Sequence, residues 1–128
     1  MKRETRNLSD VQFELRFYEG ILKQCPDFIE VLIALGEIYT KIGLYEKGLA
    51  VDKKLAYLRP EDPVILYNLA CSYSLLHRID GAFRTIQLAV FWGYDNFAFM
   101  ERDEDLHNLH QNPQFQEFLA KLKNSKPV

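Results

Sequence analysis

Apolar residues recur three and four positions apart along most of the chain, and this spacing is typical of amphipathic helices. Four runs of this kind are predicted to be helices, at residues 29–42, 45–58, 63–76 and 79–92. Gly43 separates the first two runs, Pro60 follows the second, and Gly93 follows the fourth. Glycine and proline end helices, because glycine adopts left-handed backbone and proline cannot donate a backbone hydrogen bond. The pattern therefore predicts two consecutive pairs of helices.

The two predicted pairs repeat one another at a constant offset of 34 residues, with no gap. The matched positions are Pro26 and Pro60, Leu32 and Leu66, Leu35 and Leu69, Tyr39 and Tyr73, Gly36 and Ala70, and Gly48 and Ala82. So many matches at one offset indicate an internal repeat, in which each unit buries its apolar face against the next. The small residues of the last two matches are predicted to let the paired helices approach closely.

The segment before the first pair aligns only with the second helix of a pair. It is predicted to be a single helix within residues 9–26, with Ser9 and Gln12 forming a capping box at its start. Its apolar stripe consists of Val11, Leu15, Tyr18, Ile21 and Leu22.

After Gly93 the 34-residue offset fails, and the tail is predicted to contain shorter helices. Two short pieces are expected at residues 95–102 and 104–110. A last helix is expected to begin at Pro113, because Asn112 is a good cap and proline suits the first turn.

These matched positions resemble the signature of the tetratricopeptide repeat (TPR). The residues that carry the resemblance are Leu32, Leu35, Gly36, Tyr39, Gly48 and Pro60, with Leu66, Leu69, Ala70, Tyr73, Ala82 and Ala89 in the second copy. The chain departs from the signature in having leucine in place of tryptophan at 32 and 66, Asp52 where an aromatic residue is usual, and Tyr94 in place of the closing proline. The tail after Gly93 resembles the segment that ends bacterial TPR arrays.

The resemblance implies an all-α fold, a TPR-like right-handed α-solenoid of antiparallel helix pairs with helical end caps. Residues 1–128 are expected to form a single domain. Its expected parts are an N-terminal capping helix or half repeat at 9–26, repeats at 29–62 and 63–94, and a helical C-terminal cap at 95–123.

In the TPR family the first helices of the pairs line a concave groove that holds peptide ligands. The resemblance places Glu30, Ile33, Ala34, Glu37, Thr40 and Lys41 of the first repeat there, with Val64, Tyr67, Asn68, Cys71, Ser74 and Leu75 of the second. Asn68 matches a position where family members use an asparagine to hold the ligand backbone, and the alternative is an asparagine that only meets solvent. Alanine at both Tyr67 and Asn68 is predicted to abolish partner binding while leaving the helices intact.

The charges of the chain narrow the class of ligand. The net charge is -2, which argues against nucleic-acid binding and against a polybasic membrane anchor. The predicted groove contains Glu30 and Glu37 against Lys41, so a clamp for a terminal carboxylate is disfavoured. A partly apolar segment or an amphipathic helix suits it better. Only three charged residues lie between Pro63 and Tyr94, as expected of a central repeat covered by its neighbours.

The sequence favours a cytoplasmic protein. It contains no run of about 20 apolar residues, and no apolar segment follows the basic residues of its start. Cys25 and Cys71 lack any paired spacing and are expected to be free thiols in a reducing compartment.

No enzymatic motif is present, and no cofactor is expected. The sequence has no glycine-rich phosphate loop, GxSxG or HExxH motif. The acidic residues at 101–105 with His107 and His110 could form a metal site, but they fit better as carboxylates at a helix start with surface histidines. Cys71 is expected to be a packing residue rather than a nucleophile, because no base is evident nearby.

The predicted function is a non-enzymatic protein–protein interaction module, a scaffold or adaptor that binds a peptide or helix of a partner in the concave groove. One alternative is a self-assembling homodimer that pairs through Val11, Leu15, Tyr18 and Leu22 of the N-terminal helix. Another is a small cytoplasmic chaperone for a single partner.

Overall fold

A computed structural model describes residues 8–125. Every regular element in this range is a helix. The helices are α1 (Leu8–Gln24), α2 (Ile29–Lys41), α3 (Tyr45–Leu58), α4 (Pro63–Leu75), α5 (Ile79–Phe91), α6 (Phe97–Arg102), the 3-10 turn η1 (Glu104–Leu106), α7 (His107–His110) and α8 (Pro113–Ser125). These bounds agree with the predicted helices to within a few residues.

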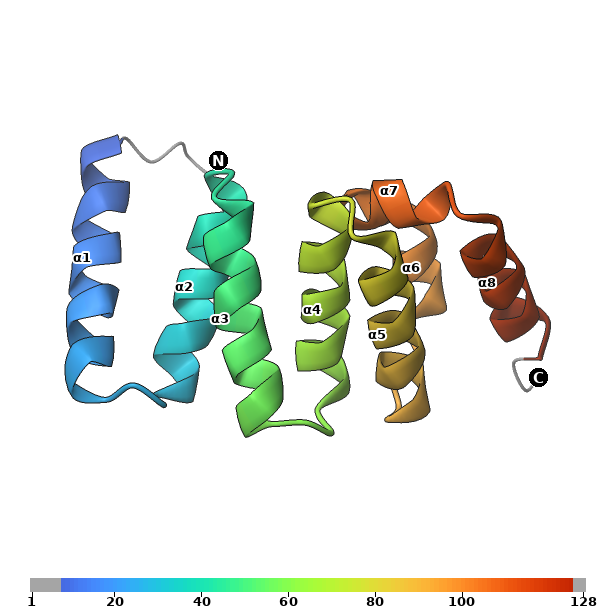
Figure 1. Cartoon of the computed structure of the whole chain (residues 1–128), viewed down its shortest axis with the longest axis horizontal. Coiled ribbons are helices and arrows are strands. Elements are labelled where there is room, and N and C mark those ends of the chain that lie inside the picture. Colours follow the sequence, from blue (N-terminus) through green and yellow to red (C-terminus); the bar gives the residue numbers. More distant parts are fainter. Residues whose placement is uncertain (1–7, 126–128) are drawn as a thin grey trace.

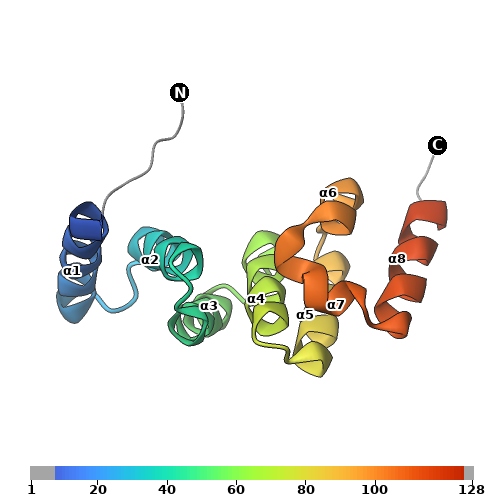
Figure 2. The ribbon, with the colours of Figure 1, turned by 90° about the horizontal axis from the view of Figure 1, so that it is seen from above.

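Helices α1 to α5 follow one another along the long axis of the molecule, α6 and α7 lie beside α4 and α5, and α8 lies at the far end (Figure 1). Seen from above, α2 and α4 lie toward one side of the stack and α3 and α5 toward the other, and α6 lies on the side of α2 and α4 (Figure 2). The chain therefore alternates between two layers. The all-α fold of stacked helix pairs that the TPR resemblance implied is confirmed.

Small residues bring the two helices of each pair close together. Gly48 is buried on α3, and a Cβ atom added there would lie 3.1 Å from Thr40 Oγ1 of α2. In the second pair, Ala70 and Ala82 are completely buried. Larger side chains at these positions would push the helices apart, because protein interiors have no spare volume. The predicted role of the small residues is confirmed.

Each pair is joined by a tight turn with one residue in left-handed backbone. In the first repeat this residue is Gly43, with φ of 85°, and in the second it is His77, with φ of 60°. The two positions differ by the repeat offset, so the geometry of the turn repeats even though the glycine does not. A side chain is disfavoured in this conformation, and His77 therefore holds a strained backbone that Gly43 avoids.

Helix α1 packs on α2 through the apolar stripe predicted from its sequence. Leu15, Tyr18, Ile21 and Leu22 contact a cluster of buried α2 residues. The Tyr39 hydroxyl of α2 also donates a 2.6 Å hydrogen bond to Glu19 Oε2 of α1. Of the residues predicted for self-assembly, Leu15, Tyr18 and Leu22 pack against α2 and are partly buried there, so they are less available to a second copy than expected.

The uncovered face of α1 carries two aromatic residues instead. Phe13 and Phe17 are 64% and 55% exposed, and their rings stack with centroids 6.3 Å apart. The start of α1 also differs from the prediction. The helix already includes Leu8, so Ser9 lies inside it rather than at its cap.

Residues 97–125, which we call the cap, fold as short helices over α4 and α5. The buried side chains of the cap, which include Met100, Leu106, Leu109 and Phe115, join the core formed by α4 and α5. The start of α8 is as predicted, because Asn112 Oδ1 accepts a 2.9 Å hydrogen bond from the Phe115 amide.

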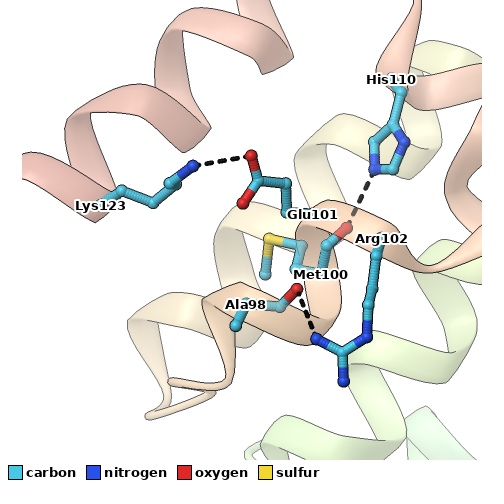
Figure 3. Close-up of polar contacts among 6 residues, drawn as sticks. All are labelled: Ala98, Met100, Glu101, Arg102, His110 and Lys123. Atoms are coloured by element: carbon cyan, nitrogen blue, oxygen red, sulfur yellow. Dashed lines mark hydrogen bonds and ion pairs between the residues drawn. The ribbon is translucent and has the colours of Figure 1, made fainter.

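Polar contacts join the elements of the cap to one another (Figure 3). Lys123 of α8 forms a 2.7 Å ion pair with Glu101 of α6, and a ring N–H of His110 in α7 donates to the Met100 carbonyl oxygen at 2.9 Å. Arg102 donates to the Ala98 carbonyl oxygen within α6 at 3.2 Å.

Ser74 of α4 fastens the cap to the second repeat. Its hydroxyl accepts a 3.1 Å hydrogen bond from the buried Leu109 amide, and its carbonyl oxygen accepts one from the Asn108 side chain at 2.8 Å. The Ser74 side chain is completely buried. Ser74 was expected in the groove from the TPR register, and that expectation is wrong because the cap covers this part of α4.

We predict that Ser74→Ala lowers the free energy of unfolding by about 1–3 kcal/mol, because the buried Leu109 amide loses its acceptor. Urea denaturation measures this loss, and hydrogen exchange at the Leu109 amide should accelerate. Ser9→Ala is the matched control, since Ser9 is exposed on α1 and its loss should change stability by less than about 0.5 kcal/mol. Equal effects of the two substitutions would contradict this role for Ser74.

Candidate peptide-binding groove

A cavity of about 480 Å³ lies along α2 and α4. We call it the groove. Its walls are side chains of α2 and α4, with contributions from α3 and from the segment 99–105 of the cap. The four elements meet there because α2 and α4 lie in the same layer and α6 lies on that side of the stack (Figure 2).

Most of the residues that the TPR register predicted for the groove do line it. They are Ile33, Glu37, Thr40, Lys41, Val64, Tyr67, Asn68, Cys71 and Leu75. Glu30 and Ala34 of α2 do not line the cavity, and Ser74 is covered by the cap. The register places residues on the correct side of each helix, whereas their access to the cavity depends on neighbouring elements.

Tyr67 contributes a wall to the groove but has a structural role. Its ring stacks on Tyr94 with centroids 4.2 Å apart, and its hydroxyl donates a 2.7 Å hydrogen bond to Asp103 Oδ2. Burial, together with nearby Cys71 and Asp103, raises the pKa of Tyr67 above its usual range, so the hydroxyl stays protonated. Removing this side chain would take away a contact between α4 and the cap, so the double alanine variant predicted from the sequence cannot test binding alone.

Asn68 and Cys71 both line the groove but differ in their exposure to solvent. Asn68 is exposed, so its amide is free to meet a ligand or solvent. Cys71 is buried, and its thiol lies 3.8 Å from Asp103 Oδ2. Burial and the neighbouring carboxylates raise the pKa of Cys71 well above its ordinary value. A thiol that stays protonated is a poor nucleophile, in agreement with the expected packing role.

Three residues of the cap reach the groove and were missed from the sequence. They are Phe99, Asp103 and Asp105. Burial and the adjacent carboxylates of Asp103 and Glu104 raise the pKa of Asp105. The acidic run at 101–105 was interpreted as a helix start, and Asp103 Oδ1 does accept from the Asp105 amide at 3.0 Å. No local signal showed that this run would fold back against α4.

Asp52 of α3 is the charged residue that lies deepest in the groove. Its side chain is 8% exposed, and its Oδ2 atom accepts a 2.5 Å hydrogen bond from the Ser72 hydroxyl of α4. Burial raises the pKa of Asp52 to about 6, and the hydrogen bond from Ser72 offsets part of that shift. The sequence signal was present, because Asp52 departs from the TPR signature.

Carboxylates outnumber cationic groups around the groove. The acidic residues that line it are Glu37, Asp52, Asp62, Asp103 and Asp105, and the basic ones are Lys41 and Arg59. Within residues 8–125, none of these carboxylates forms an ion pair with a lysine or arginine. The groove therefore presents net negative charge beside apolar walls from residues such as Ile33 and Val64.

The histidines that were weighed as metal ligands have other contacts. The His110 ring stacks on Phe115 with centroids 5.5 Å apart and binds the Met100 carbonyl oxygen, while His107 is exposed. Within the described range, no group of three or more histidine, cysteine, aspartate or glutamate side chains is placed to hold a metal ion. In the same range, no helix has the length and apolar character needed to cross a bilayer.

Comparison with known proteins gives one curated relative and several solved structures. Over 90 residues, or 68% of this chain, the sequence is 29% identical to a chloroplastic protein of Arabidopsis thaliana. The chain spans only 27% of the length of that relative. No protein-family model matches the chain.

Two of the similar solved structures are of MamA. A structure of MamA from Desulfovibrio magneticus RS-1, residue 41 to the end, superposes with a TM-score of 0.66 at 20% identity, covering 95% of this chain and 71% of that one. A structure titled MamA MSR-1 C2 gives a TM-score of 0.66 at 18% identity, covering 90% and 68%. The fold is a TPR-like α-solenoid. In this TPR-like chain the groove lies on the layer formed by α2, α4 and α6.

We predict that Asp52→Asn stabilises the protein at neutral pH. The raised pKa means that the folded state holds a proton on Asp52 which the unfolded chain releases above about pH 4. The contribution of Asp52 to stability therefore falls as pH rises from about 4 to about 6, by about 3 kcal/mol in total. Asparagine keeps an acceptor for Ser72 and carries no charge.

The difference in unfolding free energy between Asp52→Asn and the parent should be near zero at about pH 4 and should reach about 3 kcal/mol above about pH 7. Urea denaturation across this range measures it. Asp80→Asn is the control, because Asp80 is exposed on α5, and its difference should not grow over the same range. A constant difference for Asp52→Asn would show that its charge is not destabilised in the folded state.

Proposed function

We propose that this chain is a non-enzymatic protein-interaction module that binds a segment of a partner protein in the groove. The observation that carries the proposal is the cavity itself, which is bounded by two helices of the same layer and by the cap. Helical-repeat solenoids present extended concave surfaces of this kind to their ligands. The TPR-like fold supports the same role.

The lining of the groove favours a segment that combines positive charge with apolar side chains. Val64 is 57% exposed at the groove, and Ile33 and Phe99 are also exposed there. Exposed apolar side chains next to unpaired carboxylates suit a ligand whose apolar groups cover these side chains and whose positive charge neutralises the carboxylates. Asn68 lies on the same helix as Val64 and offers both a donor and an acceptor to a peptide backbone.

The role as a scaffold, adaptor or small chaperone and the cytoplasmic location, both expected from the sequence, are also part of the proposal. A scaffold, an adaptor and a small chaperone for a single partner would each use the groove in this way. A cytoplasmic location is part of the proposal, because Cys25 and Cys71 are both free thiols.

We predict that selection from a random heptapeptide library on the immobilised protein enriches peptides with lysine or arginine together with leucine, isoleucine or phenylalanine. Replacing Val64 and Ile33 by serine should weaken binding of the enriched peptides by at least about tenfold, because each substitution removes roughly 1–2 kcal/mol of apolar burial. Fluorescence anisotropy with the labelled peptides measures the affinities.

Tyr57→Ser is the matched control for this experiment. Tyr57 is 82% exposed on α3 and does not line the groove, so its loss should leave peptide affinity unchanged. Asn68→Ala replaces the double alanine variant, because it spares the contact between Tyr67 and the cap. Enrichment of acidic peptides, or binding that ignores the groove substitutions, would overturn the proposal.

Self-association is a second candidate function, and the exposed pair of Phe13 and Phe17 favours it. An apolar face of this kind on an outer helix suits an isologous contact between two copies. The face differs from the one predicted from the sequence, because Leu15 and Leu22 are engaged with α2.

We predict that, if two copies pair through this face, light scattering at increasing protein concentration reports a dimer that Phe13→Ser with Phe17→Ser converts to a monomer. Circular dichroism of this variant should be unchanged, because both side chains are exposed. Leu15→Asp is not a suitable test, since it would break the packing of α1 on α2. A monomer at all concentrations would exclude this second function.

A further inference from the structure

Asp52 is a buried carboxylate with one oxygen that the protein leaves unused. Its Oδ2 atom accepts from the Ser72 hydroxyl, whereas no hydrogen-bond donor in residues 8–125 reaches its Oδ1 atom. The side chain is 8% exposed and yet lines the groove. Buried polar atoms in folded proteins nearly always have partners, and an ionised carboxylate can accept several hydrogen bonds. The free oxygen therefore marks a place where a donor is missing.

The backbone of α2 lies close to this oxygen. A Cβ atom added to Gly36 would lie 3.3 Å from Asp52 Oδ1, so a side chain at this position would crowd the carboxylate. Gly36 and Asp52 both line the groove, so this buried carboxylate borders the cavity. Ser72 and Cys71 of α4 line the same region.

No cation of the chain supplies the missing partner. Lys41 and Arg59 line the groove, but neither forms an ion pair or hydrogen bond with Asp52 within the described residues. A buried charge without a partner is destabilising, and such groups are retained where a ligand completes them. The surrounding carboxylates, among them Asp103 and Asp105 of the cap, add to the attraction for a cation.

We propose that Asp52 is the receptor for the ammonium group of one lysine side chain of the bound segment. This inference rests on the proposed function, since it names the group by which the groove recognises its ligand. The lysine stem would lie along apolar groove residues such as Ile33 and Leu55, while its head reaches Asp52 Oδ1.

The geometry favours lysine over arginine and over a metal ion. An arginine guanidinium binds a carboxylate best through two parallel hydrogen bonds, and Ser72 already occupies Oδ2 of Asp52. An ammonium is compact and needs only one oxygen from each partner. Metal ions need several ligands around one point, and the described residues offer no such group.

The binding of lysine should depend on pH in a range set by Asp52. In the free groove burial raises the pKa of Asp52 to about 6, so a cationic ligand must displace a proton below that pH. The other charged or titratable groups at the groove are Glu37 and Lys41 of α2, Arg59 after α3, Asp62 before α4, Tyr67 and Cys71 of α4, and Asp103 and Asp105 of the cap. Tyr67, Cys71 and Asp105 have raised pKa values, and Tyr67 and Cys71 stay protonated across this range.

The test uses N-acetyl-lysine N-methylamide as the probe, with the norleucine and arginine counterparts as comparisons. Titration of the ¹⁵N-labelled protein is followed by the shifts of the Gly36 and Ser72 amides. At about pH 7.5 the lysine probe should bind at least about tenfold more tightly than either comparison, and Asp52→Asn should remove this preference. Lowering the pH to about 5 should weaken binding of the lysine probe to the parent by a similar factor.

Asp80→Asn is the matched control, because Asp80 is an exposed carboxylate on α5 that does not line the groove. It should leave the affinity for the lysine probe unchanged. Asp103→Asn tests the neighbouring carboxylate of the cap, and a larger loss there than for Asp52→Asn would overturn the assignment to Asp52. Equal affinity for the lysine and norleucine probes would also overturn it, and tighter binding of the arginine probe would overturn the choice of lysine.

The heptapeptide selection separates this inference from the proposed function. If enriched peptides bind the groove and Asp52→Asn binds them as tightly as the parent, the groove function stands and the role of Asp52 is wrong. If no peptide binds the groove and the lysine probe causes no shift at Gly36 or Ser72, both are wrong.

Discussion

The structure depends on the burial of α4 on both of its sides. One side packs on α3, and the other packs on α5 and the cap. Residues around most of its circumference are therefore buried, including Leu66, Tyr67, Ala70 and Ser74. Ala70 and Ala82 of α5 are fully enclosed in the same core, and their small side chains allow α4 and α5 to pack closely. A helix that is apolar nearly all round is stable only between two neighbours, which explains why the second repeat carries so few charges.

The cap completes both the core and the groove with the same few side chains. Ser74 binds the cap backbone on one face of α4, and Tyr67 binds Asp103 on a neighbouring face. The second contact also fixes a carboxylate at the wall of the cavity. Stability of the cap and the shape of the groove are thus coupled, because loss of either contact would move the acidic segment 103–105.

Asp52 shows a different relation between stability and the groove. Its position between α3 and α4 buries a carboxylate that only Ser72 satisfies, and burial shifts its pKa toward neutrality. Folded proteins rarely keep a destabilising group of this kind without a use for it. A ligand that places a cation at Asp52 Oδ1 would stabilise the ionised carboxylate, so its binding would raise the free energy of unfolding.

The sequence by itself determined the helices and their pairing. These features follow from local periodicity, from helix-ending residues such as Gly43 and Pro60, and from a repeat offset that needs no tertiary information. The TPR resemblance added the side of each helix predicted to face a groove, and Ile33, Val64 and Asn68 on that side line the cavity.

Only the tertiary structure decided which of those side chains stay accessible and which distant residues join them. The cap lies outside the repeat register, so nothing in the local pattern places Asp103 beside Tyr67 or covers Ser74 with Leu109. The same holds for α1, where most of the stripe predicted to be free packs in part against α2, whereas Phe13 is largely exposed. Periodicity specifies which face of a helix is apolar, but the partner of that face is chosen by packing between segments far apart in the chain.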